Sequence, residues 1–138
     1  KEYPNKLNKG VEIIGIVNFS GPVDGLDVVE KVFSDSEVEI MKTIGKALFP
    51  DTEDYAPNEI ITMYEPITYF DKNDPSIFIW HGGLDDQVPP KTFEAFVALL
   101  KNDPNKNEVI FDPEAGHSPT NESLAETYKS IFNFIDRL

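Results

Sequence analysis

Hydrophobic and polar residues alternate along the chain in blocks that predict strands separated by helices. Three runs rich in Val, Ile and Phe read as strands: Val11–Phe19, Ser76–Trp80 and Asn107–Phe111. The first run, VEIIGIVNF, is almost continuously apolar, which is typical of a strand covered on both faces in a parallel sheet.

Segments with apolar residues at three- and four-residue spacing lie between and after these strands, and they predict helices. We expect helices over Ser36–Phe49, over Asn58–Tyr64, from Pro89–Pro90 onward and over Asn121–Leu138. Their apolar stripes are Val38, Met41, Ile44 and Leu48 in the first; Phe93, Phe96, Val97 and Leu100 in the third; and Leu124, Tyr128, Ile131, Ile135 and Leu138 in the last. Pro50 and Pro66 mark helix ends, and Thr120 or Asn121 is a suitable N-cap.

The order of strands and helices predicts an α/β fold with a three-stranded parallel sheet flanked by helices on both faces. Functional residues of such sheets lie in the loops at the carboxyl ends of the strands. Those loops are Ser20–Asp27, His81–Pro89 and Pro113–Pro119.

Composition narrows the classes of function. The chain has 138 residues, enough for one domain or part of one, and a net charge of −13. This acidity argues against binding to nucleic acid or to an anionic membrane surface. No cysteine is present, so neither a disulfide nor a thiolate metal site is expected. The sequence leaves the compartment open, secreted or cytoplasmic.

Two of the predicted loops carry a carboxylate and an imidazole at a suitable spacing. Asp85 follows the SIFIW strand, and His117 follows the strand that ends at Phe111. Adjacent parallel strands would bring their carboxyl-terminal loops together, so that Asp85 could accept the imidazole N–H and fix its tautomer.

Several segments together resemble the α/β-hydrolase superfamily, in particular acetyl-xylan and feruloyl esterase-like members of the lipase and carboxylesterase group. The pattern H-G-x-x-D-x-x-V-P is followed by G-H about thirty residues later, as in that superfamily. The segments are His81–Pro89, Gly116–His117, Glu65–Phe70 (similar to S-P-I-T-Y), Asp74–Pro75 and Ile14–Asp24. The resemblance covers residues 11–138.

This resemblance implies that residues 1–138 form the C-terminal part of a single hydrolase domain. Asp85 would be the triad acid and His117 the general base. A serine would attack an ester carbonyl, with acyl groups on carbohydrate as candidate substrates and with no metal or organic cofactor. The same pattern occurs in serine peptidases of the prolyl-oligopeptidase type, which remain an alternative. A non-catalytic binding module with a hydrolase fold is a second alternative.

The chain departs from the family at the nucleophile. None of its seven serines lies in the elbow pattern G-x-S-x-G, and the nucleophile of this family precedes the acid. We therefore expect the nucleophile before Lys1, and we expect the 138-residue chain alone to be inactive. Ser118 is a weak candidate, because Pro119 has no N–H to offer and Thr120 is β-branched. The residues that bind substrate are not identifiable from the sequence.

Other polar residues are candidates for a functional role, but a structural role is favoured for each. Asp86 is a less favoured acid, and His81 fits a packed structural histidine better than a catalytic one. The loop residues Ser20, Gly21 and Asp24 could line a cleft, although ordinary turn chemistry is favoured. The acidic groups Asp51–Asp54 and Asp71–Asp74 lack the spacing of an EF-hand and are expected to be solvated loops.

Two expectations concern packing. The aromatic residues Phe78, Trp80 and those of the last helix are expected in the core. The run Val11–Phe19 would present an apolar edge if its neighbouring strand lay outside the chain. We therefore expect the chain to form homo-oligomers or to associate with a missing N-terminal half.

Overall fold

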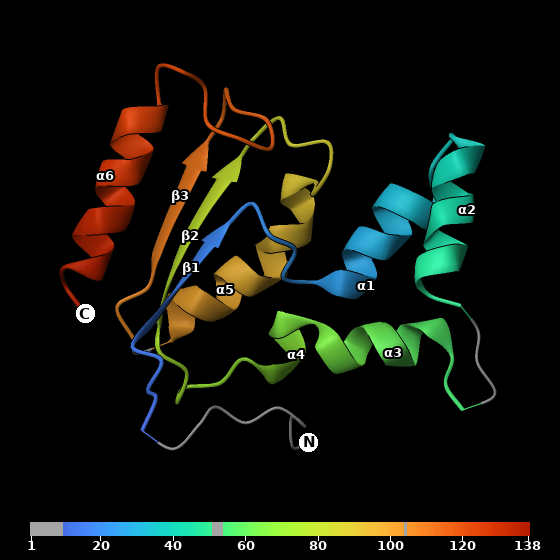
Figure 1. Ribbon diagram of the computed structural model, residues 1–138, viewed down its shortest axis with the longest axis horizontal. Coiled ribbons are helices and arrows are strands. Elements are labelled where there is room, and N and C mark those ends of the chain that lie inside the picture. The colour runs from blue at the N-terminus through green and yellow to red at the C-terminus, as the bar shows by residue number, and fades with distance from the viewer. Residues whose placement is uncertain (1–9, 51–53, 104) are drawn as a thin grey trace.

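The computed structural model describes residues 10–50, 54–103 and 105–138, and its centre is a three-stranded parallel sheet (Figure 1). The strands are β1 (Gly15–Phe19), β2 (Ser76–Gly82) and β3 (Glu108–Asp112), in the order β1-β2-β3. Gly15 pairs with Ser76, and Phe78 pairs with Glu108. The prediction of an α/β fold with three parallel strands is confirmed. The strands are parallel because the helical connections return the chain to the end of the sheet where the previous strand began.

Helices connect the strands. After β1 come α1 (Gly25–Val28), the π-helical segment η1 (Val29–Ser34), α2 (Glu39–Leu48), α3 (Pro57–Tyr64) and α4 (Pro66–Tyr69). After β2 come the 3-10 turn η2 (Pro90–Phe93) and α5 (Glu94–Asn102), and α6 (Leu124–Ile135) follows β3. The four expected helices are present. Helices α2 and α6 are shorter than expected, α3 begins one residue earlier, and the third begins as a 3-10 turn at Pro90. The sequence analysis missed α1, which begins inside the expected Ser20–Asp27 loop, η1, which follows it, and α4.

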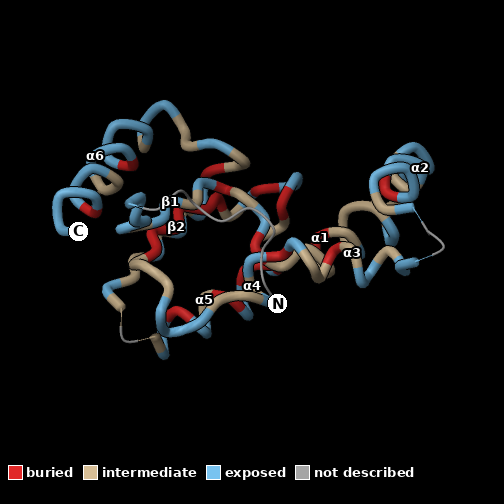
Figure 2. Tube along the Cα trace, turned by 60° about the horizontal axis from the view of Figure 1, so that its bottom comes forward, coloured by how far each residue is buried: buried red, intermediate tan, exposed pale blue. Residues whose placement is uncertain are grey.

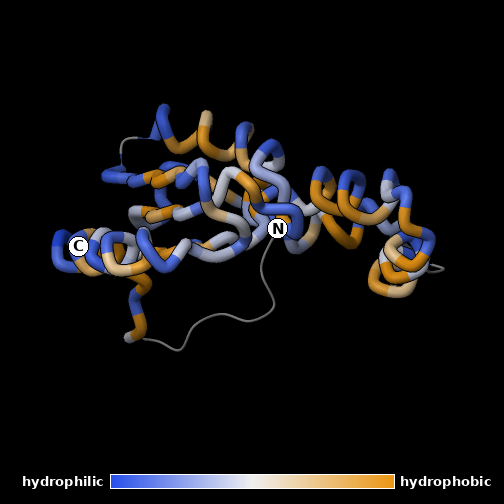
Figure 3. Tube along the Cα trace, turned by 90° about the horizontal axis from the view of Figure 1, so that it is seen from above, coloured by the Kyte–Doolittle hydropathy of each residue, from blue (hydrophilic) through white to orange (hydrophobic). Residues whose placement is uncertain are grey.

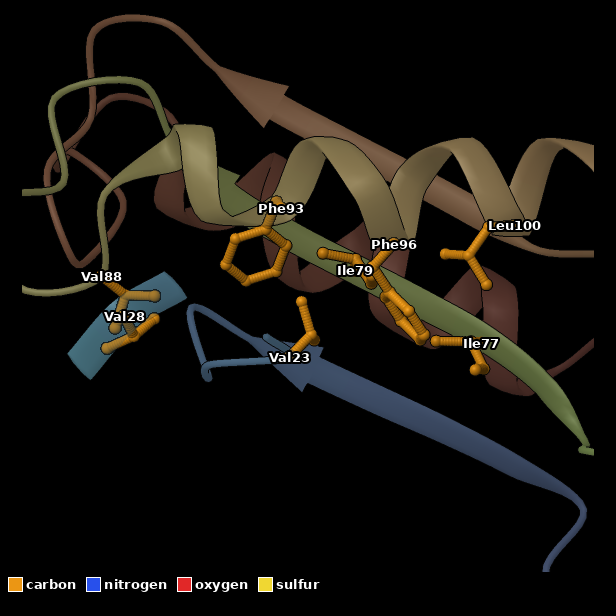
Figure 4. Packing of buried hydrophobic residues seen from close by; sticks show 8 residues of the cluster. All are labelled: Val23, Val28, Ile77, Ile79, Val88, Phe93, Phe96 and Leu100. Atoms are coloured by element: carbon orange, nitrogen blue, oxygen red, sulfur yellow. The ribbon is translucent and has the colours of Figure 1, made fainter. Parts of the chain in front are cut away.

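The two faces of the sheet bury different side chains, because successive residues of a strand point to opposite sides. Helix α5 covers one face and α6 the other (Figures 1 and 2). The α5 face holds the larger cluster, shown in Figure 4: Val23, Val28, Ile77, Ile79, Val88, Phe93, Phe96 and Leu100. The α6 face holds Phe78, Trp80, Ala115 and Phe134. The expected core positions of Phe78 and Trp80 are confirmed.

The apolar stripe expected for the last helix is largely wrong. Helix α6 buries Thr127 and Phe134 and half-buries Ile131. The rest of the stripe and one further aromatic are exposed: Leu124, Tyr128, Phe132, Ile135 and Leu138. Helix α6 contacts the sheet through the side that carries Ile131 and Phe134, so the apolar side chains on its other sides stay exposed.

Helix α2 departs from its expected stripe in a similar way. Gly45 is its buried residue, and a Cβ there would lie 2.8 Å from the Cβ of Phe33. Val38, Ile44 and Leu48 stay exposed, because α2 packs on η1 and away from the sheet. In the view from above, the helices that follow β1 project sideways from the sheet (Figure 3).

Strand β1 is shorter and more exposed than the sequence predicts. It begins at Gly15, and Ile14 is 62 % exposed. Ile16, Val17 and Phe19 are exposed as well, so β1 is not covered on both faces. The physical reason is that β1 lies at the edge of the sheet and pairs with β2 alone among the described residues. Within the same residues, no helix is long and apolar enough to cross a membrane.

Candidate active site

The carboxyl ends of β2 and β3 hold two loops in close contact. The N–H of Gly83 donates to the Asp112 carbonyl oxygen at 2.7 Å, and the N–H of Leu84 donates to that of Ala115 at 2.8 Å. Gly82 has no room for a side chain, because a Cβ there would lie 1.9 Å from the Gly116 carbonyl oxygen. The glycine after His81 is therefore what allows the acid loop to lie against the histidine loop.

The two residues singled out in these loops form a hydrogen bond. His117 Nδ1 lies 3.0 Å from Asp85 Oδ2. The other carboxylate oxygen, Oδ1, accepts the N–H groups of Gln87 and Val88, each at 2.9 Å. The carboxylate is fully buried, and these backbone bonds compensate its loss of water. Asp85 is thus held by its own turn and turned toward His117.

The position of the imidazole proton follows from this contact. A carboxylate oxygen can only accept, so Nδ1 of His117 must donate and Nε2 of the neutral ring carries a lone pair. The His117 side chain is 39 % exposed, and no hydrogen bond to its Nε2 is found among the described residues. The arrangement can therefore take up a proton at Nε2 and stabilise the resulting imidazolium through Asp85.

His81 has a different environment. Its ring is buried against Phe93, with ring centroids 4.0 Å apart, and Nε2–H donates to the Val88 carbonyl oxygen at 2.8 Å. Nε2 also lies 3.6 Å from Asp85 Oδ2. Burial lowers the pKa of His81, which outweighs the opposing effects of the Val88 carbonyl and Asp85. This favours the interpretation of His81 as a structural histidine.

The weaker candidates are not brought into contact with His117. Asp86 and Ser118 are both exposed, and no hydrogen bond of either to His117 is found among the described residues. Ser20 is buried at φ 53° with no partner for its hydroxyl among those residues. Asp24 caps α1 by accepting the Asp27 N–H at 3.0 Å, which is ordinary turn chemistry.

The acidic groups provide no metal site in the described part of the chain. Asp71 and Asp74 close a turn, in which the N–H of Asp71 donates to Asp74 Oδ2 at 2.8 Å. Residues 51–53 of the first acidic group lie outside the described residues. Where the structure describes the chain, no three His, Cys, Asp or Glu side chains gather as metal ligands would.

An apolar pocket of about 560 Å³ adjoins the Asp85–His117 pair. Its lining is Pro22, Gly25, Val28, Val29, Val32, Phe33, Met41, Leu48, Phe49, Ile61, Asp86, Gln87, Val88 and His117. Half of these residues come from α1, η1 and α2, elements that the sequence analysis did not connect to the site. The available signal was Asp24 as a cap, followed by the closely spaced apolar residues Val28, Val29 and Val32.

Comparisons with known proteins show similarity over most of this chain to two solved structures. A solved structure named a bifunctional GH43-CE from Bacteroides eggerthii superposes with a TM-score of 0.64 at 26 % identity, over 91 % of this chain and 16 % of that one. A truncated form of a carbohydrate esterase from gut microbiota superposes with a TM-score of 0.59 at 22 % identity, over 88 % of this chain and 42 % of that one. The chain thus spans less than half of either structure, and no curated protein matches it.

The family model described as BD-FAE matches residues 1–100, which is well over half of the chain. The matched part contains β2 with the loop of Asp85 and the helices that line the pocket, and it ends before β3 and His117. The chain therefore belongs to the BD-FAE family, an esterase domain of the α/β-hydrolase fold.

Proposed function

We propose that this chain supplies the acid and the general base of a serine hydrolase that cleaves carboxylic esters. The observation that carries the proposal is the 3.0 Å contact between His117 Nδ1 and the buried Asp85 carboxylate beside an apolar pocket. Membership of the BD-FAE family supports the esterase activity in this proposal. The names of the two solved structures favour acyl groups on carbohydrate as substrates.

The proposed reaction uses Nε2 of His117 twice. A serine hydroxyl attacks the ester carbonyl carbon while Nε2 takes its proton, and Asp85 stabilises the imidazolium. The tetrahedral intermediate collapses, the bond to the alcohol oxygen breaks, and Nε2 gives that oxygen its proton. Water then attacks the acyl carbon while Nε2 takes a proton from it. The bond to the serine oxygen breaks, Nε2 returns the proton to that oxygen, and the carboxylic acid leaves.

We also propose that the serine comes from a segment outside these 138 residues. The seven serines lack the elbow pattern, Ser20 is buried, and Ser118 lies one residue from the base without a hydrogen bond to its ring among the described residues. The exposed edge of β1 is the place where a strand carrying that serine would pair, because its apolar residues Ile16 and Val17 lack cover.

The test is hydrolysis of 4-nitrophenyl acetate by the polypeptide encoded by the complete reading frame that contains these codons. We expect turnover that falls at least 10³-fold in His117→Ala, whereas the exposed control Asp136→Asn stays within twofold of the parent. The 138-residue chain alone should not turn over the ester. A parent that keeps its activity without the His117 imidazole would refute the assignment. A folded parent that hydrolyses no ester would favour a binding module.

A further inference from the structure

Glu65 is a buried carboxylate that the proposed reaction does not use. It lies between α3 and α4, at the position of the serine in the S-P-I-T-Y pattern, and it is 7 % exposed. A buried carboxylate is costly unless hydrogen bonds replace its water, so its partners indicate what it holds in place.

The partners of Glu65 come from two separate segments. Oε2 accepts the N–H groups of Gly25 at 3.1 Å and Leu26 at 3.2 Å, the first residues of α1. Oε1 accepts the hydroxyl of Thr68 in α4 at 2.6 Å. The carboxylate therefore ties the beginning of α1 to α4, forty residues further along the chain.

Other contacts close the same junction. The N–H of Ile67 donates to the Val23 carbonyl oxygen at 3.0 Å. A Cβ at Gly25 would lie 2.8 Å from the side chain of Ile61, so α1 and α3 are in tight contact. These contacts leave the beginning of α1 little freedom to shift while Glu65 is in place.

Val28, Val29 and Val32 of α1 and η1 line the apolar pocket together with residues of the acid loop and His117. Figure 4 shows Val28 of α1 beside Val88 of the acid loop, within one buried cluster. The hydrogen bonds of Glu65 thus hold the beginning of α1, the helix that carries Val28 into the pocket lining, beside α4.

We propose that Glu65 is a positioning residue that keeps the pocket open in a shape suited to a bulky apolar group of the ester. This inference rests on the proposed function for its consequence in catalysis, because selectivity requires turnover. Binding of an apolar group to the pocket does not require the serine, so binding and turnover can fail separately. Ligands of the expected class carry an aryl-alkyl or branched alkyl group.

The first experiment titrates 4-phenyl-2-butanone, an aryl-alkyl ketone with no scissile bond, into the isotope-labelled chain and follows its NMR spectrum. We expect shifts at the amides of Val29 and Val32 and at the His117 ring. Glu65→Ala should weaken binding at least tenfold and speed hydrogen exchange at the Gly25 and Leu26 amides. Glu65→Gln, which can still accept both N–H groups, should stay within threefold, and the exposed control Glu126→Gln should match the parent.

The second experiment measures selectivity in the polypeptide from the complete reading frame. The ratio of kcat/KM for 4-nitrophenyl 3-phenylpropanoate to that for the acetate should fall about tenfold in Glu65→Ala, mainly through KM, and return in Glu65→Gln. A general loss of folded protein would lower both esters equally and leave the ratio unchanged. Absent turnover together with intact binding would refute the proposed function but leave the role of Glu65 in place.

Two results would overturn the inference. One is a folded Glu65→Ala chain that binds the ketone as tightly as the parent, and the other is a parent that does not bind it at these residues. If Glu65→Ala fails to fold, Thr68→Val decides, because it removes the hydroxyl bound to Oε1 and keeps both bonds to α1. We expect binding weakened about threefold in Thr68→Val, and parental affinity would refute the positioning role.

Discussion

The replacement Asp85→Asn tests the contact on which the proposed reaction depends. Asp85 presents acceptors on both sides, Oδ1 to two backbone N–H groups and Oδ2 to His117 Nδ1. Asparagine has the same shape but offers one oxygen and one NH₂ group. The oxygen will face the two N–H groups, because turning the NH₂ toward them would leave both without an acceptor, the buried one of Val88 included.

The amide NH₂ then faces Nδ1 of His117. Two donors cannot share one hydrogen bond, so the imidazole must move its proton to Nε2, and Nε2 can no longer accept the proton of the serine. In the serine-protease triad the same replacement lowers kcat roughly 10⁴-fold by this change of tautomer. That factor corresponds to a barrier higher by about 5.4 kcal/mol. The free energy of unfolding should fall much less, by about 1–3 kcal/mol, because the backbone bonds survive.

Two measurements check this reasoning. Hydrolysis of 4-nitrophenyl acetate by the polypeptide from the complete reading frame should fall at least 10³-fold, with urea unfolding showing that the variant remains folded. Long-range ¹H–¹⁵N NMR spectra of the labelled chain should report Nδ1–H of His117 in the parent and Nε2–H in Asp85→Asn. An unchanged tautomer with a rate loss below tenfold would refute the role assigned to Asp85.

Three further predictions concern the chain itself. Gly82→Ala should lower the free energy of unfolding by about 3 kcal/mol or more in urea titrations, because its Cβ would lie 1.9 Å from the Gly116 carbonyl oxygen. A Cβ at Gly116 would lie 3.9 Å from its nearest neighbour, so the control Gly116→Ala should lower it by less than about 1 kcal/mol. Burial lowers the pKa of His81 below 6.5, so the unfolded chain binds a proton at this histidine first as the pH falls. The free energy of unfolding should therefore decline below about pH 6.5, by up to about 1.4 kcal/mol per pH unit. In urea titrations, His81→Phe should lack this pH-dependent loss. The exposed edge of β1 should cause self-association in sedimentation experiments at high concentration, and Val17→Lys should reduce it; a parent that stays monomeric would contradict this.

The sequence by itself determined the parts of this protein that depend on local pattern. Runs of β-branched residues predicted the three strands, and their alternation with helices predicted a parallel sheet. The carboxyl ends of adjacent parallel strands meet at one edge, so the spacing of Asp85 and His117 was sufficient to predict that they meet. The roles of Asp85 as acid and His117 as base came from the family resemblance, which extends over residues 11–138.

Tertiary structure alone decided which apolar faces are covered and where the pocket lies. The stripes of α2 and α6 were visible in the sequence, but their burial depends on what lies opposite, and Leu48 and Tyr128 are exposed. The pocket wall depends on Glu65, whose partners lie forty residues away along the chain. Local pattern cannot specify such contacts, because only the folded chain brings the beginning of α1 and the α3–α4 junction to the same place.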